Sequence, residues 1–193
     1  AGKAGICPPR AWHAWMEGFY PDYPQAVIDS TYECMGYSLA RLAADDSNPE
    51  ERHCYHFQNM NPVLPEALVQ MTMGTPSALY NGGLLQAHLR YFDPQKRRAG
   101  LPDHVAALVR AVSADGAAVT LVNTDPVARQ AVVLQAGSFS EHEFSAVQAA
   151  GGRIERVDGR WFSVELGPAT QVDLKLDMRR FVHGPSHEGP QWT

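Results

Sequence analysis

The sequence predicts an α+β protein in which a short N-terminal helical segment precedes an antiparallel β-sandwich. Apolar residues recur at helical spacing in the first part of the chain, whereas short stretches with period-two alternation fill the remainder. Turn-forming residues separate those stretches about every ten residues, which is typical of a sandwich. Because the helices precede the strands, we divide the chain into a helical, aromatic-rich segment (1–82), an antiparallel β-sandwich (83–184) and a C-terminal tail (185–193).

The segment from Pro24 to Ala44 has the clearest helical pattern. Proline suits the first turn of a helix, and five apolar residues follow with 4-3-4-3 spacing, which is typical of a helix with one buried face. This apolar stripe consists of Ile28, Tyr32, Met35, Leu39 and Leu42. Gly36 interrupts the helix at a cost of about 1 kcal/mol in propensity and indicates close helix packing. Shorter helices are expected at 49–57 and 65–73.

The most regular strand pattern lies between Ala117 and Gly137. Val119 and Leu121 alternate with other residues, as do Val132 and Leu134, and the turn-forming run NTDP lies between the two pairs. This pattern predicts two antiparallel strands joined by a short connection. The proline of that run cannot donate to a strand ladder, so it belongs to the connection.

Turn signals place the other strands. The pair Asp115-Gly116 is typical of a hairpin and makes the preceding apolar run a strand. The pair Asp158-Gly159 predicts a second hairpin, between 154–157 and 160–166. Expected strands are 84–92, 105–112, 141–147, 154–157, 160–166 and 171–176, and 75–83 is expected to be a loop.

Composition excludes several classes of protein. The chain has 193 residues, 45% hydrophobic and 19% charged, which is typical of a globular protein with a hydrophobic core. A net charge of −5 disfavours nucleic-acid binding, and no apolar run approaches the roughly 20 residues of a membrane span. The first residues contain no apolar signal-peptide region. We expect a soluble protein and favour the cytoplasm as its compartment.

Neither a cofactor nor a metal is expected. The glycine-containing runs GGLLQA and AAGGRIE lack the residues of a phosphate-binding loop. His53 and His56 are two possible metal ligands without further ligands nearby in the sequence. Cys7, Cys34 and Cys54 have no metal-binding spacing; reduced thiols are favoured over one disulfide with one free thiol. A nucleophilic pair of Cys54 with a neighbouring histidine is the less favoured alternative to burial of the cysteine.

Aromatic residues are dense in the run AWHAWMEGFYPDYP. Two interpretations are open: the two tryptophans stack on a sugar or another flat ligand, or Trp12, Trp15 and Phe19 lie at helical spacing and fill a core. The aromatic residues are Trp12, Trp15, Phe19, Tyr20 and Tyr23. Glu17 and Asp22 lie in the same run and are the candidate pair of carboxylates that glycoside hydrolysis requires.

The order of several segments resembles the C-terminal end of large bacterial proteins in which an α-helical toroid is followed by a terminal β-sandwich, as in many carbohydrate-active enzymes. The resemblance rests on PEALVQMTMG, YNGG, LRYFDPQKRRAGLP, VTLVNTDPVARQAVVLQAG and VELGPATQVDLKLDMRRF. It implies that this chain holds the last helices of such a toroid and its sandwich. These motifs are structural rather than catalytic.

Two hypotheses for the function follow. In the first, the chain is part of a glycoside hydrolase-like protein, with Glu17 or Asp22 as acid and base and a sugar-binding set consisting of Trp12, Trp15, Tyr20, Tyr23 and His56. In the second, it is a non-catalytic accessory or interaction module whose sandwich supports a larger catalytic chain. The expected partners are a carbohydrate in the first case, and a larger protein chain or further copies of this chain in the second. An open cleft beside the tryptophans favours the first hypothesis, and their burial favours the second.

Overall fold

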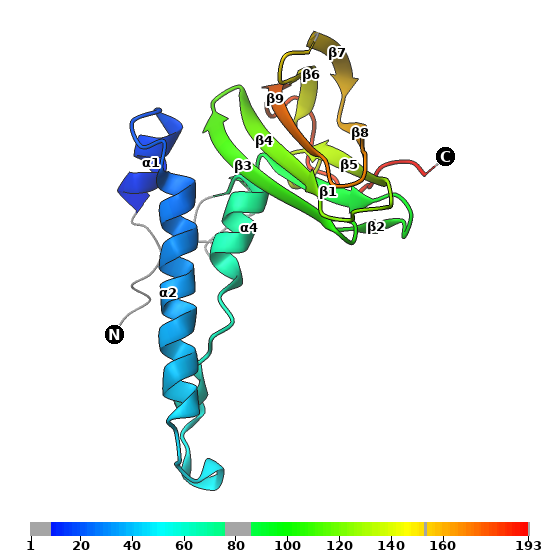
Figure 1. Cartoon of the computed structure of the whole chain (residues 1–193). Helices are drawn as coiled ribbons and strands as arrows, with labels where there is room; N and C mark the ends of the chain where they lie inside the picture. Colours follow the sequence, from blue (N-terminus) through cyan, green and yellow to red (C-terminus); the bar gives the residue numbers. More distant parts are fainter. Residues whose placement is uncertain (1–8, 76–85, 153, 193) are drawn as a thin grey trace.

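The helices and strands follow the order that the sequence predicts. The computed structural model describes residues 9–75, 86–152 and 154–192, and within them helices come first and two antiparallel sheets follow, which confirms the α+β class (Figure 1). The helices are α1 (Pro9–Met16), α2 (Tyr23–Ala43), the 3-10 turn η1 (Pro49–Glu51), α3 (Cys54–Gln58) and α4 (Pro65–Met73). The expected loop at 75–83 lies outside the described residues except for its first position.

Nine strands form two sheets in the described part of the chain. They are β1 (Leu89–Asp93), β2 (Arg98–Ala99), β3 (Val105–Ser113), β4 (Gly116–Asn123), β5 (Gln130–Ala136), β6 (Glu143–Ala149), β7 (Ile154–Gly159), β8 (Trp161–Leu166) and β9 (Gln171–Arg179). One sheet has the order β2-β1-β5-β8 and the other β3-β4-β9-β6-β7. Apolar side chains of both sheets join one buried cluster, which includes Leu121 and Leu134.

The predicted hairpin between Ala117 and Gly137 is wrong, although both of its strands exist. Strand β4 pairs with β3 and β9, whereas β5 pairs with β1 and β8 in the other sheet. The turn-forming run is therefore a crossover between sheets. Asn123 stabilises it, because its buried side chain donates to the carbonyls of Ala128 and Gly167 at 2.8 Å each. Alternation of apolar residues predicts a strand with one buried face, but it does not predict which strand pairs with it.

One of the other two predicted hairpins is present. Strands β3 and β4 pair across Asp115-Gly116 as expected. Strands β7 and β8 do not pair across Asp158-Gly159, because β7 pairs with β6 and β8 pairs with β5. The second prediction is therefore wrong for the same reason as the hairpin above.

The helices form an arm that projects from the sandwich. We call residues 23–64 the helical arm: α2 leads away from the sheets, η1 and α3 lie at the far end, and an irregular segment leads back to α4 beside the sandwich (Figure 1). At about 1.5 Å per residue, α2 is about 31 Å long. Only its first part is buried, at Tyr23, Pro24 and Val27.

The C-terminal tail is held against the sandwich. The Ser186 amide in the tail donates to the carbonyl of Phe139 at 2.7 Å, and just before the tail the His183 amide donates to the carbonyl of Glu141 at 3.2 Å. The rings of Trp192 and Phe92 lie edge to face, 6.2 Å apart.

Candidate functional site

The N-terminal aromatic residues form the joint between the arm and the sandwich. Trp12, Trp15 and Tyr23 are 7%, 3% and 0% exposed. The Trp15 ring stacks on Tyr23 with a centroid separation of 5.2 Å, and its indole N–H donates to the carbonyl of Arg110 in β3 at 3.0 Å. Tyr20 is half-buried and meets Tyr23 edge to face. These rings are packed in the core, and those of Trp12, Trp15 and Tyr23 have no open face on which a sugar could stack.

The other predicted site residues lie in two separate regions of the molecule, and only His56 lines the pocket described below. Glu17 follows α1 and Asp22 precedes α2; both are exposed, and the Asp22 side chain makes no capping hydrogen bond. His56 lies in α3, at the opposite end of α2 from Trp12 (Figure 1). The structure therefore does not bring His56 together with the N-terminal residues.

A polar cluster around Asp45 organises the tip of the arm, which we define as residues 45–59. Asp45 Oδ2 lies 2.9 Å from Arg52 Nη2 and 3.0 Å from His56 Nε2. Its Oδ1 accepts hydrogen bonds from the amide and the hydroxyl of Ser47, at 3.2 and 2.7 Å. The side chain of Asn48 caps η1 by accepting from the amide of Glu50 at 3.2 Å. These contacts hold the chain reversal between α2 and α3.

The same contacts determine the charge of Asp45. Hydrogen bonds from Ser47 and His56, with the nearby Arg52 guanidinium, hold the pKa of the Asp45 carboxyl well below its usual range. Asp45 is therefore ionised at neutral pH. Its contacts with Arg52 and His56 hold the tip together, and we call this arrangement the clasp.

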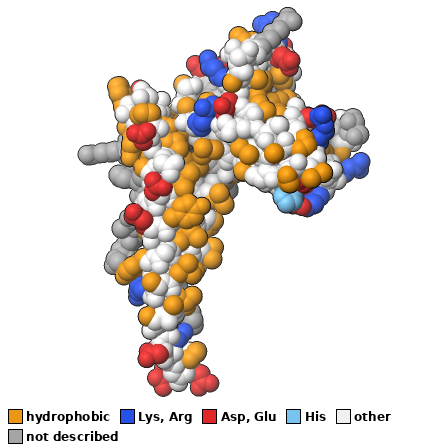
Figure 2. Space-filling model, in the orientation of Figure 1, with side chains coloured by type: hydrophobic (Ala, Val, Ile, Leu, Met, Phe, Trp, Pro, Cys, Tyr) orange, Lys and Arg blue, Asp and Glu red, His pale blue; other side chains and the backbone are white. Residues whose placement is uncertain are grey.

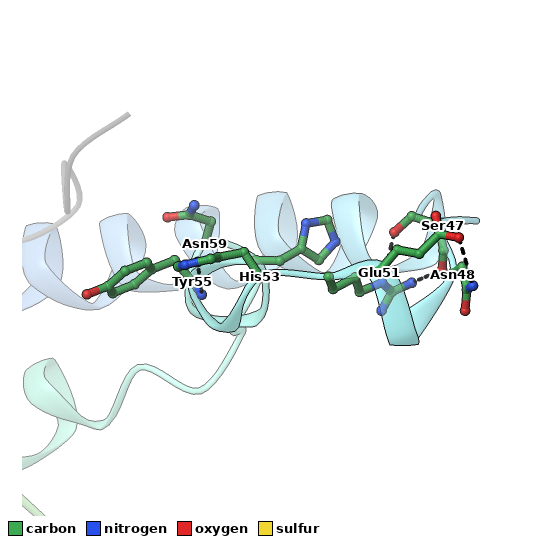
Figure 3. A pocket seen from close by; sticks show the side chains of 8 residues that line it. Ser47, Asn48, Glu51, His53, Tyr55 and Asn59 are labelled. Carbon is green, nitrogen blue, oxygen red and sulfur yellow. Dashed lines mark hydrogen bonds between the residues drawn. The ribbon is translucent and has the colours of Figure 1, made fainter.

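An open pocket of about 430 Å³ lies beside this clasp. Figure 3 shows its lining side chains along the tip, with Ser47, Asn48 and Glu51 at one end and Tyr55 and Asn59 at the other. The pocket also includes His53, whose ring stacks on Tyr55 at 5.0 Å.

The tip also contains an exposed cysteine. Cys54 Sγ lies 3.6 Å from His53 Nδ1, but the amide of Tyr55 also donates to that nitrogen, at 3.3 Å. This histidine is therefore held by its neighbours in the chain, and among the described residues no third side chain orients it as a base. Cys34 and Cys54 are free thiols. Cys7 lies outside the described residues. Among the described residues, no group of three or more His, Cys, Asp and Glu side chains could hold a metal ion.

A second polar cluster is buried within the sandwich. His142 is 0% exposed; the amide of Phe181 donates to its Nδ1 at 3.0 Å, and Arg180 Nε lies 3.3 Å from its Nε2. Burial and the Arg180 charge lower the pKa of His142 to about 4, against the opposing effect of the Glu141 carboxylate. Burial also lowers the pKa of His88, whose ring nitrogens face the backbone. Because the side chains of His88, Glu141 and His142 are buried, we interpret this cluster as structural.

The apolar stripe of α2 is the largest departure from the burial that the sequence predicts. Tyr32, Leu39 and Leu42 are 67%, 50% and 44% exposed, whereas Ile28 and Met35 are half-buried. Figure 2 shows hydrophobic side chains along the length of the arm. In the described part of the chain, only the irregular return segment and two short helices lie beside the outer half of α2 (Figure 1). A face with the spacing of a buried face is thus open to solvent.

The comparisons with known proteins cover the helical part. Residues 2–69 match the model of a domain of unknown function (DUF8034), a region that includes α1, α2 and the tip and ends within α4. No curated protein and no solved structure matches the chain. Among the described residues, no helix is both long and apolar enough to cross a membrane.

Sequence reasoning missed the clasp and the exposed stripe for different reasons. Asp45 and Arg52 are seven positions apart around an irregular turn, so no periodic pattern links them. The stripe itself is visible in the sequence, but spacing alone does not tell whether its cover belongs to the same chain.

Proposed function

We propose that this chain is a non-catalytic interaction module, in which the helical arm docks on another protein chain and the β-sandwich holds the arm in place. The observation that carries the proposal is the exposure of Tyr32, Leu39 and Leu42 on one face of α2, at the spacing of a packed helix. Contiguous exposed apolar side chains on a folded protein mark interaction sites. Docking helices present residues three and four positions apart in this way.

The joint between the arm and the sandwich supports this proposal. The Trp15 indole links α1 to β3 through the carbonyl of Arg110. The amide side chain of Gln70 in α4 donates to the hydroxyl of Tyr23, and the hydroxyl of Tyr91 in β1 donates to the carbonyl of Thr72 at 2.7 Å. The base of the arm is therefore fixed to both sheets. A rigid mount lowers the conformational entropy that docking costs.

Photo-crosslinking in the cells that make the protein tests this function. Benzoylphenylalanine replaces Tyr32 in one variant and Val127 in a control, since Val127 is also apolar and 82% exposed but lies on the sandwich. The expected result is one crosslinked product of defined mass at position 32, none at position 127, and loss of that product when Leu39→Glu is added. Equal crosslinking at both positions, or insensitivity to Leu39→Glu, would contradict the proposal.

A second candidate is carbohydrate binding at the tip pocket. It is favoured by the Tyr55 ring, which is 63% exposed and lies at the same end of the pocket as the amide of Asn59, while Asn48 and Glu51 line the other end (Figure 3). An aromatic face with nearby amides and a carboxylate suits a polyhydroxylated ligand. The test is saturation-transfer NMR with a panel of mono- and oligosaccharides. Binding that Tyr55→Ala abolishes and Phe19→Ala leaves intact would support this candidate, and the absence of any transfer would reject it.

A further inference from the structure

The charge of this chain is divided unevenly between its two parts. Residues 1–75 contain nine acidic and four basic side chains, whereas residues 76–193 contain twelve of each, so the formal charge of −5 belongs to the helical part. The arm itself has six carboxylates and two arginines. Figure 2 shows acidic side chains beside the hydrophobic band of the arm and at its tip.

Both arginines of the arm are engaged within it. Arg52 lies 2.9 Å from the carboxylate of Asp45. Arg41 donates to the carbonyl of Asn59 at 3.1 Å, and its guanidinium lies 5.7 Å from the centre of the Tyr37 ring. Several carboxylates are in the opposite situation. Among the described residues, the side chains of Glu33, Asp46 and Glu50 have no hydrogen-bonding or ion-pair partner, and all three are exposed.

The apolar stripe of α2 has a notch near its centre, at Gly36. With about 3.6 residues per turn, Gly36 falls on the same face as Tyr32 and Leu39. A Cβ at Gly36 would meet nothing within 4 Å, so the notch opens to solvent. In packed helices, a side chain of one helix inserts into a hole formed by four residues of the other. A glycine there lets the second backbone approach closely, which offsets its cost of about 1 kcal/mol in propensity.

From these observations we infer that the apolar stripe of α2 binds an amphipathic α-helix of another polypeptide, one whose apolar face is flanked by lysine or arginine. This inference rests on the proposed function and names the partner's chemistry. An apolar side chain of the partner enters the notch at Gly36 between Tyr32 and Leu39. Its basic flank faces Glu33 and the acidic tip. A second copy of this chain fits less well, because it would bring the same six carboxylates against them.

Two designed peptides test the inference on the intact chain. Both are 21-residue amphipathic helices, the length of α2, with blocked ends and the same leucine stripe; one has lysine on its flanks and the other glutamate. Binding is measured by fluorescence anisotropy. The lysine peptide is expected to bind with at least a tenfold lower Kd, equivalent to about 1.4 kcal/mol. The difference should shrink between about 50 mM and about 500 mM salt, because salt screens exposed charges.

Variants locate the contact. Gly36→Leu fills the notch without a clash and should weaken the binding of both peptides at least tenfold. Leu39→Glu should weaken the binding of the glutamate peptide by at least the same factor. Glu33→Lys should reduce the preference for the lysine peptide. Glu165→Lys, the same substitution at an exposed position on the sandwich, should leave that preference unchanged.

Each result has a distinct meaning. Equal affinities of the two peptides, both weakened by Gly36→Leu, would overturn the inference of a basic partner. They would leave the proposed interaction module intact. Peptide binding that ignores Gly36→Leu and Leu39→Glu would overturn both. Sedimentation of the unmodified chain as a dimer that Leu39→Glu dissociates would make a second copy the occupant, and would also overturn the inference.

Discussion

Replacement of Trp15 by alanine should show whether the N-terminal aromatic residues are core or platform. The ring is 3% exposed, stacks on Tyr23 and donates one hydrogen bond to the carbonyl of Arg110. Deleting a buried tryptophan to alanine costs about 3–5 kcal/mol, from the lost burial and from the cavity left behind. The lost hydrogen bond is the smaller contribution, because one hydrogen bond adds only about 1 kcal/mol net to stability. We therefore expect Trp15→Ala to lower the free energy of unfolding by about 4 kcal/mol.

The assay is urea denaturation followed by far-UV circular dichroism, which reports both the helices and the sheets. The matched control is Phe19→Ala, four positions away in the same aromatic run, since Phe19 is 83% exposed. That change should alter the free energy of unfolding by no more than about 0.5 kcal/mol. A loss below about 1 kcal/mol for Trp15→Ala, or equal losses for the two variants, would refute the assignment of Trp15 to the core.

Three further predictions concern the sandwich and the arm. Because the folded His142 has a pKa of about 4 and an unfolded histidine about 6.5, unfolded chains bind the proton first as pH falls. The free energy of unfolding should therefore fall by up to about 1.4 kcal/mol per pH unit as the pH is lowered between those values. Urea titrations at several pH values should show a smaller fall for His142→Asn. An unchanged dependence of the free energy of unfolding on pH in this variant would contradict the prediction. Gly116→Ala should destabilise the protein by about 1–3 kcal/mol, because the added Cβ would clash with the carbonyl oxygen of Leu176 in β9. Gly36→Ala, on the open face of α2, should stabilise the protein by up to about 1 kcal/mol. In thermal melts, the melting temperatures of the two variants should shift in opposite directions. Asn123→Ala should cost about 2 kcal/mol, because it removes the two hydrogen bonds that the side chain donates to the carbonyls of Ala128 and Gly167 at the sheet crossover. The Gly167 carbonyl keeps the Thr170 hydroxyl as a donor. A loss below about 1 kcal/mol in urea denaturation would contradict this role of Asn123.

The sequence predicts the elements of this fold better than their pairing. The helix at 24–44 and the strand at 105–112 are present within a residue or two, because side-chain periodicity reports the local conformation directly. The hairpin at Asp115-Gly116 is local and was predicted for the same reason. The two wrong hairpins lie where the chain crosses from one sheet to the other. Alternating residues bury one face equally well in either sheet, so spacing alone does not choose the partner strand.

The candidate site divides in the same way. That the tryptophans at 12 and 15 either bind a ligand or fill a core was evident from the sequence, and so was the 4-3-4-3 stripe from Ile28 to Leu42. Burial distinguishes these alternatives, and burial depends on which distant segments of the chain pack against the residue. Strand β3 packs against Trp15 at Arg110, whereas in the described chain Tyr32 and Leu39 remain exposed.

Local sequence is sufficient for the α+β class, the extent of the long helix and the existence of an apolar face on it, because each of these depends on neighbours within a few positions. Tertiary contacts are needed to show that the aromatic run is a joint, that Asp45 and Arg52 clasp the tip, and that the apolar face of α2 is exposed. These are contacts between residues brought together by chain reversal and sheet pairing. Their free energies depend on the whole packing arrangement rather than on local spacing.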